Sequence, residues 1–174
     1  MLEIGVATGA PLKSINSELK HVQITAIDID EDYIKKAKEV LAKEDNIQVK
    51  LMDFYKSPEL GLTFDTLLFG SSFMLMPDQK KALDVARSIC VPGSKVYFLL
   101  TLYPSGTKLA KLETIKPMLK KYTSVDFGKL IYENDFERTL IENKMRIIKK
   151  ERITSNINIF LKVFRFFCVE CEFI

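Results

Sequence analysis

The first eleven residues contain a glycine loop of the kind that holds nucleotides. The apolar residues 2–4 run into three small residues, Gly5, Ala7 and Gly9, and then into Pro11. In many α/β proteins a strand that breaks into a glycine loop before a helix cradles a phosphate or a nucleotide. Glycine lets the backbone approach such a ligand closely because it carries no side chain. The loop therefore predicts a nucleotide-like ligand.

Three acidic residues stand where they could bind the same ligand. Glu3 lies in the first apolar stretch, Asp28 ends the second, and Asp53, followed by Phe54, ends the third. Open α/β sheets bind ligands at the carboxyl ends of their strands, and a carboxylate there can accept hydrogen bonds from both ribose hydroxyls. An Asp after a strand is also a common helix cap, and either Asp28 or Asp30 could cap the next helix. The ordered set of acids nevertheless favours a binding site.

The first hundred residues predict the elements that would position these side chains. Apolar strand-like runs alternate with helical periodicity, which indicates a Rossmann-like, doubly wound α/β fold with a mostly parallel sheet. The predicted strands are residues 2–4, 24–29, 47–52, 64–69 and 95–102. The predicted helices are residues 11–20, 31–43 and 77–89, with turns around 57–58 and 92–93.

The last seventy residues follow a different pattern. Helices are predicted at residues 108–121 and 134–143, and strand-like runs at 145–153 and 157–173. Only three residues separate the last two runs, which is too short for a parallel crossover. The sheet should therefore end in a C-terminal antiparallel β-hairpin.

Composition limits the class of protein. The 174 residues are 47% hydrophobic and 28% charged, as expected of a single soluble domain spanning 1–174. The net charge is +3, and no run approaches the ~20 apolar residues of a membrane span. The three cysteines predict no disulfide framework and suit a reducing, cytoplasmic location. Cys168 and Cys171 should point to opposite faces of a strand, so no metal site is expected.

The order of these motifs resembles the class I S-adenosyl-L-methionine-dependent methyltransferases, particularly the small-molecule types. Their first motif is an acid followed by Gly-x-Gly-x-Gly, and here Glu3-Ile-Gly5-Val-Ala7-Thr-Gly9 has alanine in the middle. Their second and third strands end in acids, matched by Asp28 and Asp53. Their fourth strand begins Phe-Asp and runs into a loop, their fifth follows a Pro-Gly turn, and the family also ends in an antiparallel hairpin.

The resemblance implies a cofactor, S-adenosyl-L-methionine, and a role for each residue of the motifs. The glycine loop would pass under the methionine moiety, and Glu3 would support the loop and the ligand's ammonium. Asp28 would hold the ribose hydroxyls. Asp53 would accept a hydrogen bond from the adenine amino group. The remaining expected contacts are Ile29 and Phe54 with the adenine, and residues 69–72, including Phe69 and Ser71, beside the sulfonium.

The resemblance also bears on the reaction. Methyl transfer from a sulfonium needs alignment of nucleophile and methyl more than it needs a base, so no catalytic residue is assigned. His21 is expected at the wrong end of the sheet, whereas Met74 and Tyr103 lie where acceptors approach or serve as packing residues. The adenine and glutamine methyltransferases carry a tetrad (Asn/Asp)-Pro-Pro-(Tyr/Phe) after the fourth strand, where this chain has Gly70-Ser-Ser-Phe73. A small-molecule O, N or C acceptor is therefore expected.

Several alternatives stay open. Family members usually have helices ahead of the first motif that cover the cofactor, and here the chain starts at that motif. A partner chain or oligomer could supply this lid, or the domain could be a non-catalytic scaffold. Gly5-x-Ala7-x-x-Ala10 with Asp28 about twenty residues later is also a degenerate dinucleotide fingerprint of an NAD-dependent oxidoreductase. A nucleic-acid partner is not expected, although the lysine-rich second half leaves an RNA-directed methyltransferase as a smaller branch.

Overall fold

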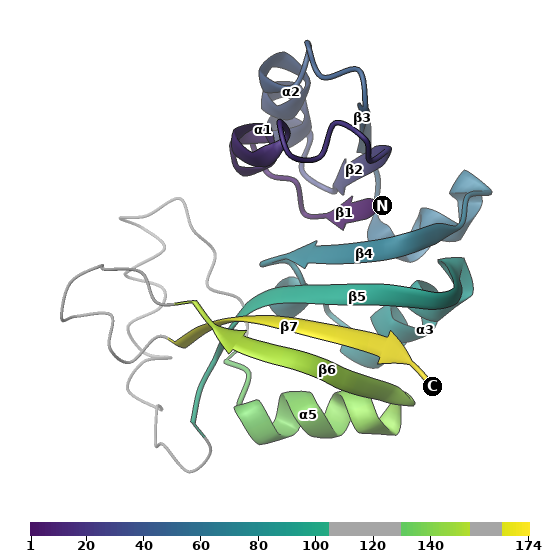
Figure 1. Cartoon of the computed structure of the whole chain (residues 1–174), viewed down its shortest axis with the longest axis vertical. Helices are drawn as coiled ribbons and strands as arrows, with labels where there is room; N and C mark the ends of the chain where they lie inside the picture. Colours follow the sequence, from purple (N-terminus) through teal and green to yellow (C-terminus); the bar gives the residue numbers. More distant parts are fainter. Residues whose placement is uncertain (105–129, 154–164) are drawn as a thin grey trace, which may run out of the picture.

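The computed structural model describes residues 1–104, 130–153 and 165–174, whose strands form one mixed sheet (Figure 1). The strand order is β3-β2-β1-β4-β5-β7-β6. Strands β1 to β5 pair in parallel, and β7 is antiparallel to both β5 and β6. The strands are β1 (Leu2–Ile4), β2 (Ile24–Asp28), β3 (Ile47–Leu51), β4 (Phe64–Gly70), β5 (Cys90–Leu102), β6 (Met145–Arg152) and β7 (Arg165–Phe173).

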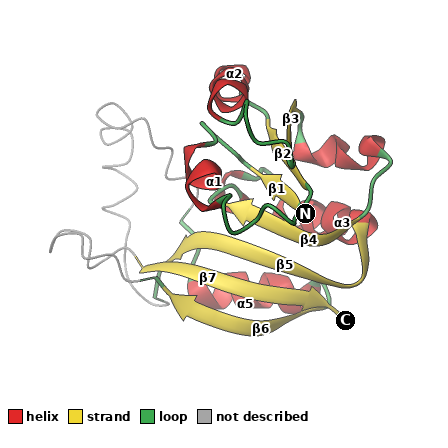
Figure 2. Ribbon diagram, turned by 45° about the horizontal axis from the view of Figure 1, so that its top comes forward, coloured by secondary structure: helices red, strands yellow, loops and turns green. Residues whose placement is uncertain are grey.

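Helices cover the sheet from both sides (Figure 2), as the alternation of elements predicts. On one face, α1 (Ala10–Ile15) and α2 (Glu31–Val40) pack with β2 and β3 around Ala26 and Ala37. On the other, α3 (Gln79–Ile89) and α5 (Glu133–Glu142) pack on the larger core together with the short 3-10 helices η1 (Phe54–Leu60) and η2 (Phe73–Leu75). No helix in the described part of the chain is long and apolar enough to span a membrane.

Four phenylalanines form the centre of the larger core. The rings of Phe69 and Phe98 stack with centroids 5.1 Å apart on the neighbouring strands β4 and β5. Phe73 and Phe136 meet Phe98 edge to face, at 4.9 and 5.4 Å. These geometries are the ones aromatic pairs prefer, so β4, whose end carries part of the candidate site, and its neighbour β5 rest on a dense core.

Helix α1 is shorter than predicted, ending at Ile15 instead of residue 20. The cause is the next residue, Asn16, which is buried and exchanges side-chain hydrogen bonds with Asn46 at 3.0 and 3.1 Å. Asn46 also donates to the carbonyl oxygens of Leu19 and Val22. This polar cluster holds residues 16–22 in turns, because buried polar groups must keep their hydrogen-bond partners.

The predicted Pro-Gly turn before the fifth strand is instead an irregularity inside β5. Phe64 pairs with Cys90, and the next paired position is Thr66 with Lys95, so β5 carries extra residues there. Gly93 lies within them at φ 82°. Proline has no N–H to donate to the hydrogen bonds between strands, so within sheets it is confined to edges and bulges. Pro92 lies at such an irregularity.

The C-terminal antiparallel hairpin is confirmed, but its tight three-residue turn is wrong. The Ile153 N–H donates to the Phe166 carbonyl, so the β6–β7 pairing extends to these two residues, a register that a three-residue turn after Ile153 does not allow. This register turns Phe167 and Val169 into the core. Cys168 is half-buried and Cys171 buried, on opposite faces as expected. The predicted helix at 108–121 and residues 154–164 lie outside the described residues.

Candidate functional site

The glycine loop between β1 and α1 has an unusual backbone. Gly5, Ala7 and Gly9 have φ of 85°, 48° and 74°, all in the left-handed region that glycine favours. The N–H groups of Gly5 and Val6 both donate to the Ile27 carbonyl, which ties the loop to β2. A Cβ on Gly9 would lie 2.9 Å from a Leu41 methyl carbon. Glycine there therefore lets the start of α1 approach the end of α2.

Asp28 lies directly beside this loop, as the sequence predicts. Its Oδ2 accepts a hydrogen bond of 2.9 Å from the Ala7 N–H, and its Oδ1 accepts one of 3.0 Å from the Asp30 N–H. The cap of α2 is Asp30, whose Oδ1 accepts from the Tyr33 N–H. Asp28 is consequently not the helix cap. Its carboxylate links the loop to the carboxyl end of β2.

A pocket of about 340 Å³ opens at the carboxyl ends of β2 and β3, where Ile29, the residue after Asp28, lines it. The two strand ends are joined there by the Met52 N–H, which donates to the Asp28 carbonyl. Asp53 lines the pocket, and its Oδ1 also accepts from the Tyr55 N–H at the start of η1. Ile29 is 71% exposed, an apolar side chain presented to solvent. The pocket is lined by Ile29, Leu51, Met52, Asp53, Lys56 and Glu59.

Four of these pocket residues were not predicted as site residues from the sequence: Leu51, Met52, Lys56 and Glu59. Lys56 and Glu59 lie on η1, which replaces the turn expected around Ser57-Pro58. The signal was available, because Asp53 two residues before Tyr55 is a typical helix-capping acid. Pro58 argued against a helix at this place in the sequence, because a proline in a helix interior usually ends the helix.

Glu3 is buried beneath the loop with an unsatisfied carboxylate oxygen. Its side chain is 7% exposed, and Oε2 has no hydrogen-bond partner among the described residues. Burial raises its pKa from 4.5 to about 7. A Cβ on Gly70, the last residue of β4, would lie 3.6 Å from Oε1. Glu3 thus sits where β1 and β4 end, against the turn that follows β4.

That turn also contacts the glycine loop. Ser71 has φ 59°, and its N–H donates to the carbonyls of Phe69 and Leu99. The buried Ser72 donates through Oγ to the Ile4 carbonyl at 2.5 Å. The predicted site residues Glu3, Gly5, Ala7, Gly9, Asp28, Asp53 and Ser71 therefore lie along one edge of the sheet.

Phe54 and Phe69 occupy the core and not the pocket. They are 4% and 0% exposed and meet edge to face at 5.2 Å. Phe69 and Phe98 lie on the face of the sheet that α3 and α5 cover. The Phe69 side chain therefore points away from the face that α1 and α2 cover. In this conformation the Phe54 ring is not placed for the adenine contact expected from the sequence, and the Phe69 ring lies in the core.

Three other side chains were considered for a role in the reaction: Met74, Tyr103 and His21. Met74 and Tyr103 are buried packing residues, and burial raises the pKa of Tyr103 to about 12. His21 is exposed in the turn before β2, at the amino end of the strands. None of the three offers a base next to the glycine loop.

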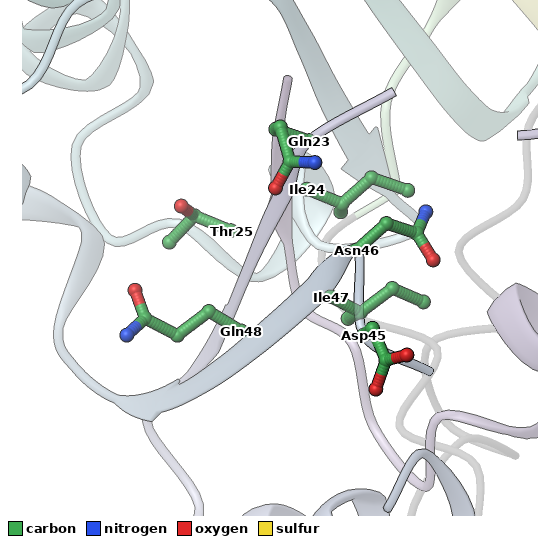
Figure 3. Close-up of a pocket in the computed structure, with 7 residues that line it drawn as sticks. All are labelled: Gln23, Ile24, Thr25, Asp45, Asn46, Ile47 and Gln48. Atoms are coloured by element: carbon green, nitrogen blue, oxygen red, sulfur yellow. The ribbon is translucent and has the colours of Figure 1, made fainter. Parts of the chain in front are cut away.

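A second pocket, of about 140 Å³, lies at the opposite end of β2 and β3 (Figure 3). It is formed by residues that precede or begin these strands, among them the register partners Thr25 and Gln48. It contains neither the loop nor Asp28 and Asp53. It is lined by Gln23, Ile24, Thr25, Asp45, Asn46, Ile47 and Gln48.

The chain is similar to known methyltransferases in fold. It superimposes on geranyl diphosphate C-methyltransferase from Streptomyces coelicolor A3(2) with a TM-score of 0.77 and 7% identity, covering 99% of this chain and 72% of that one. For the mitomycin 7-O-methyltransferase MmcR the TM-score is 0.74 with 14% identity, covering 99% and 48%. For the glycopeptide N-methyltransferase MtfA it is 0.71 with 13% identity, covering 99% and 79%.

The sequence comparisons identify the family. The chain is 30% identical over 116 residues to lovastatin nonaketide synthase mokA of Monascus pilosus, a match that covers 63% of this chain and 4% of that protein. The profile of the methyltransferase domain matches residues 2–96, from β1 into β5, which is more than half of the chain. The chain therefore belongs to the methyltransferase domain family.

Proposed function

We propose that the chain is an S-adenosyl-L-methionine-dependent methyltransferase acting on a small-molecule O, N or C acceptor. The observation that carries the proposal is a left-handed glycine loop in a methyltransferase domain, with Glu3 beneath it, Asp28 bonded to it and Asp53 following the neighbouring strand β3. The Streptomyces enzyme was solved with S-adenosyl-L-homocysteine and MtfA with sinefungin. These ligands support the same cofactor class here.

The residues at this edge fit such a cofactor. Asp28 already accepts two backbone hydrogen bonds, and each carboxylate oxygen has a second acceptor site for a ribose hydroxyl. The exposed Ile29 gives an apolar surface beside the pocket for the adenine. Asp53 can accept from the adenine amino group, and the unpartnered Glu3 oxygen can accept from an ammonium.

The bound cofactor would supply a methyl group on a sulfonium, an already activated leaving group. The protein's own contribution is then to bind and align. The hydrogen bond from Ala7 to Asp28 fixes the loop relative to the ribose-binding acid. The aromatic core behind Phe69 and Phe73 gives the turn after β4 a rigid base. A rigid support matters because small displacements of the reacting atoms reduce the rate strongly.

The test is calorimetric titration with S-adenosylmethionine, S-adenosylhomocysteine and NAD. We expect micromolar binding of the first two and none of NAD. Asp28→Ala should weaken binding about 10- to 100-fold, because hydrogen bonds to a charged group contribute about 1.5–3 kcal/mol. Asp28→Asn keeps an acceptor for the Ala7 N–H while removing the charge, and so separates loop support from ribose binding.

Asp45→Ala, an exposed acid at the amino end of β3, is the matched control and should bind normally. Binding of NAD alone would replace this proposal with the oxidoreductase. Binding of S-adenosylmethionine that Asp28→Ala leaves unchanged would show that the assigned site is wrong.

A further inference from the structure

We propose that Glu3 is protonated in the free protein and releases this proton when a ligand bearing an ammonium group binds against it. Binding would then be coupled to pH, and the site would select ammonium-bearing ligands. The inference rests on the proposed function, because it concerns the methionine end of the same site. It goes further in assigning a proton to one atom and a consequence to its loss.

The position of Glu3 leaves its carboxyl group without a counter-charge. Its register partners on the flanking strands are Ala26 of β2 and Leu68 of β4, neither of which is charged or polar in its side chain. Gly70, the last residue of β4, lies close to the Glu3 carboxyl group and has no side chain to offer. Oε2 is buried with no hydrogen-bond partner in the described chain.

The charged groups on the elements around Glu3 do not compensate it. They are Asp28 on β2, Asp65 on β4, Lys13 on α1 and the amino group of Met1. The Met1 amino group lies 3.8 Å from Asp65 and donates to the Gln23 carbonyl. The pKa of Glu3 is raised to about 7 by burial, with no contribution from any of these charges.

A ligand ammonium would favour the ionised form of Glu3 over the protonated form. A positive charge within hydrogen-bond distance favours the ionised carboxylate, so the complex would contain a carboxylate paired with the ammonium. The carboxyl proton would leave to solvent, and no bond other than that O–H is broken. Below about pH 7, each increase of one pH unit should raise the affinity for the ligand up to tenfold, because the Glu3 carboxyl must lose one proton on binding. Above pH 7 the affinity should level off.

The experiment is calorimetric titration with S-adenosylhomocysteine at pH 6.0 and 8.5, in pairs of buffers that differ in ionisation enthalpy. The dependence of the measured heat on buffer gives the number of protons released. We expect close to one proton at pH 6.0 and close to none at pH 8.5. The probe without an ammonium is 5′-methylthioadenosine, which should bind with no proton release at either pH.

Glu3→Gln keeps the shape of the side chain and removes the titrating proton. It should abolish proton release and reduce the preference for S-adenosylhomocysteine over 5′-methylthioadenosine at least tenfold at pH 8.5. The control Glu18→Gln changes an exposed acid beyond α1 and should behave as the wild type. Circular dichroism checks that both variants fold.

The outcomes separate this inference from the proposed function. Normal binding of S-adenosylhomocysteine by the wild type with no proton release at pH 6.0 would overturn the role of Glu3 and leave the cofactor assignment intact. Proton release that persists in Glu3→Gln would assign the proton to another group and also overturn it. Failure of the wild type to bind at either pH would defeat the proposed function itself.

Discussion

The contact between the glycine loop and the turn after β4 makes a sharp prediction for Gly5→Ala. A Cβ on Gly5 would lie 2.7 Å from the Ser72 Cβ and 3.2 Å from its Oγ. Ser72 is buried and its hydroxyl is bonded to the Ile4 carbonyl, so it has little freedom to move. Either the loop or the turn would have to shift.

The cost has two parts. Alanine in the left-handed region, at φ 85°, costs about 1–2 kcal/mol. Forcing a methyl group into a packed contact costs about 1–3 kcal/mol more. The free energy of unfolding should therefore fall by about 2–5 kcal/mol. For a chain of this size the melting temperature should fall by roughly 5–20 °C.

Gly61→Ala is the matched control, because Gly61 also has a positive φ, of 63°, but no described atom within 4 Å of an added Cβ. It should lose only the backbone part, about 1–2 kcal/mol. Urea unfolding monitored by circular dichroism measures both variants. Ser72→Gly in the Gly5→Ala background should recover part of the difference. Equal losses for Gly5→Ala and Gly61→Ala would refute the contact between the loop and the turn.

Two further predictions concern the core and the buried acid. Phe98→Ala should lower the free energy of unfolding by about 3–5 kcal/mol, because its fully buried ring contacts three other phenylalanines. Tyr97→Ala, on the opposite face of β5, should lower it clearly less. Similar urea midpoints for the two variants would contradict the aromatic core. The folded-state pKa of Glu3 is about 7 against 4.5 for an unperturbed group, so the folded protein holds the proton more tightly. Its stability should fall by about 3 kcal/mol as pH rises from 4.5 to 7, and Glu3→Gln should flatten urea midpoints measured across this range; an unchanged slope would show that Glu3 is not the group responsible.

The strands and their end residues were predictable because each rests on a local pattern. A buried parallel strand such as β2 is a short apolar run whatever its neighbours are, and Asp28 ends that run. Asp53 follows the partly exposed edge strand β3, whose alternating pattern is also readable from the sequence. Their meeting at one edge followed from the rule that parallel strands share a carboxyl edge. The strand order was not predictable in this way, since it depends on pairings between residues far apart in the chain.

The features that sequence patterns missed depend on tertiary contacts. Asn16 ends α1 because Asn46, thirty residues later, binds it inside the protein. The register of β7 is set by which side chains face the core and not by the turn residues. Phe54 follows an acid of the site, yet its ring is taken up by the core through Phe69. The sequence position of a residue next to a motif therefore predicts where its backbone lies, but the direction of its side chain depends on the packing around it.

The measurement that tests the central claim most directly is a crystal structure of the chain with S-adenosylhomocysteine, soaked or grown at a concentration that saturates binding. We predict ligand density at the carboxyl ends of β1 to β3, with the ribose on Asp28, the adenine between Ile29 and Asp53, and the ammonium against Glu3. Density at the amino-end pocket beside Thr25 and Gln48, or none at either place, would contradict the account.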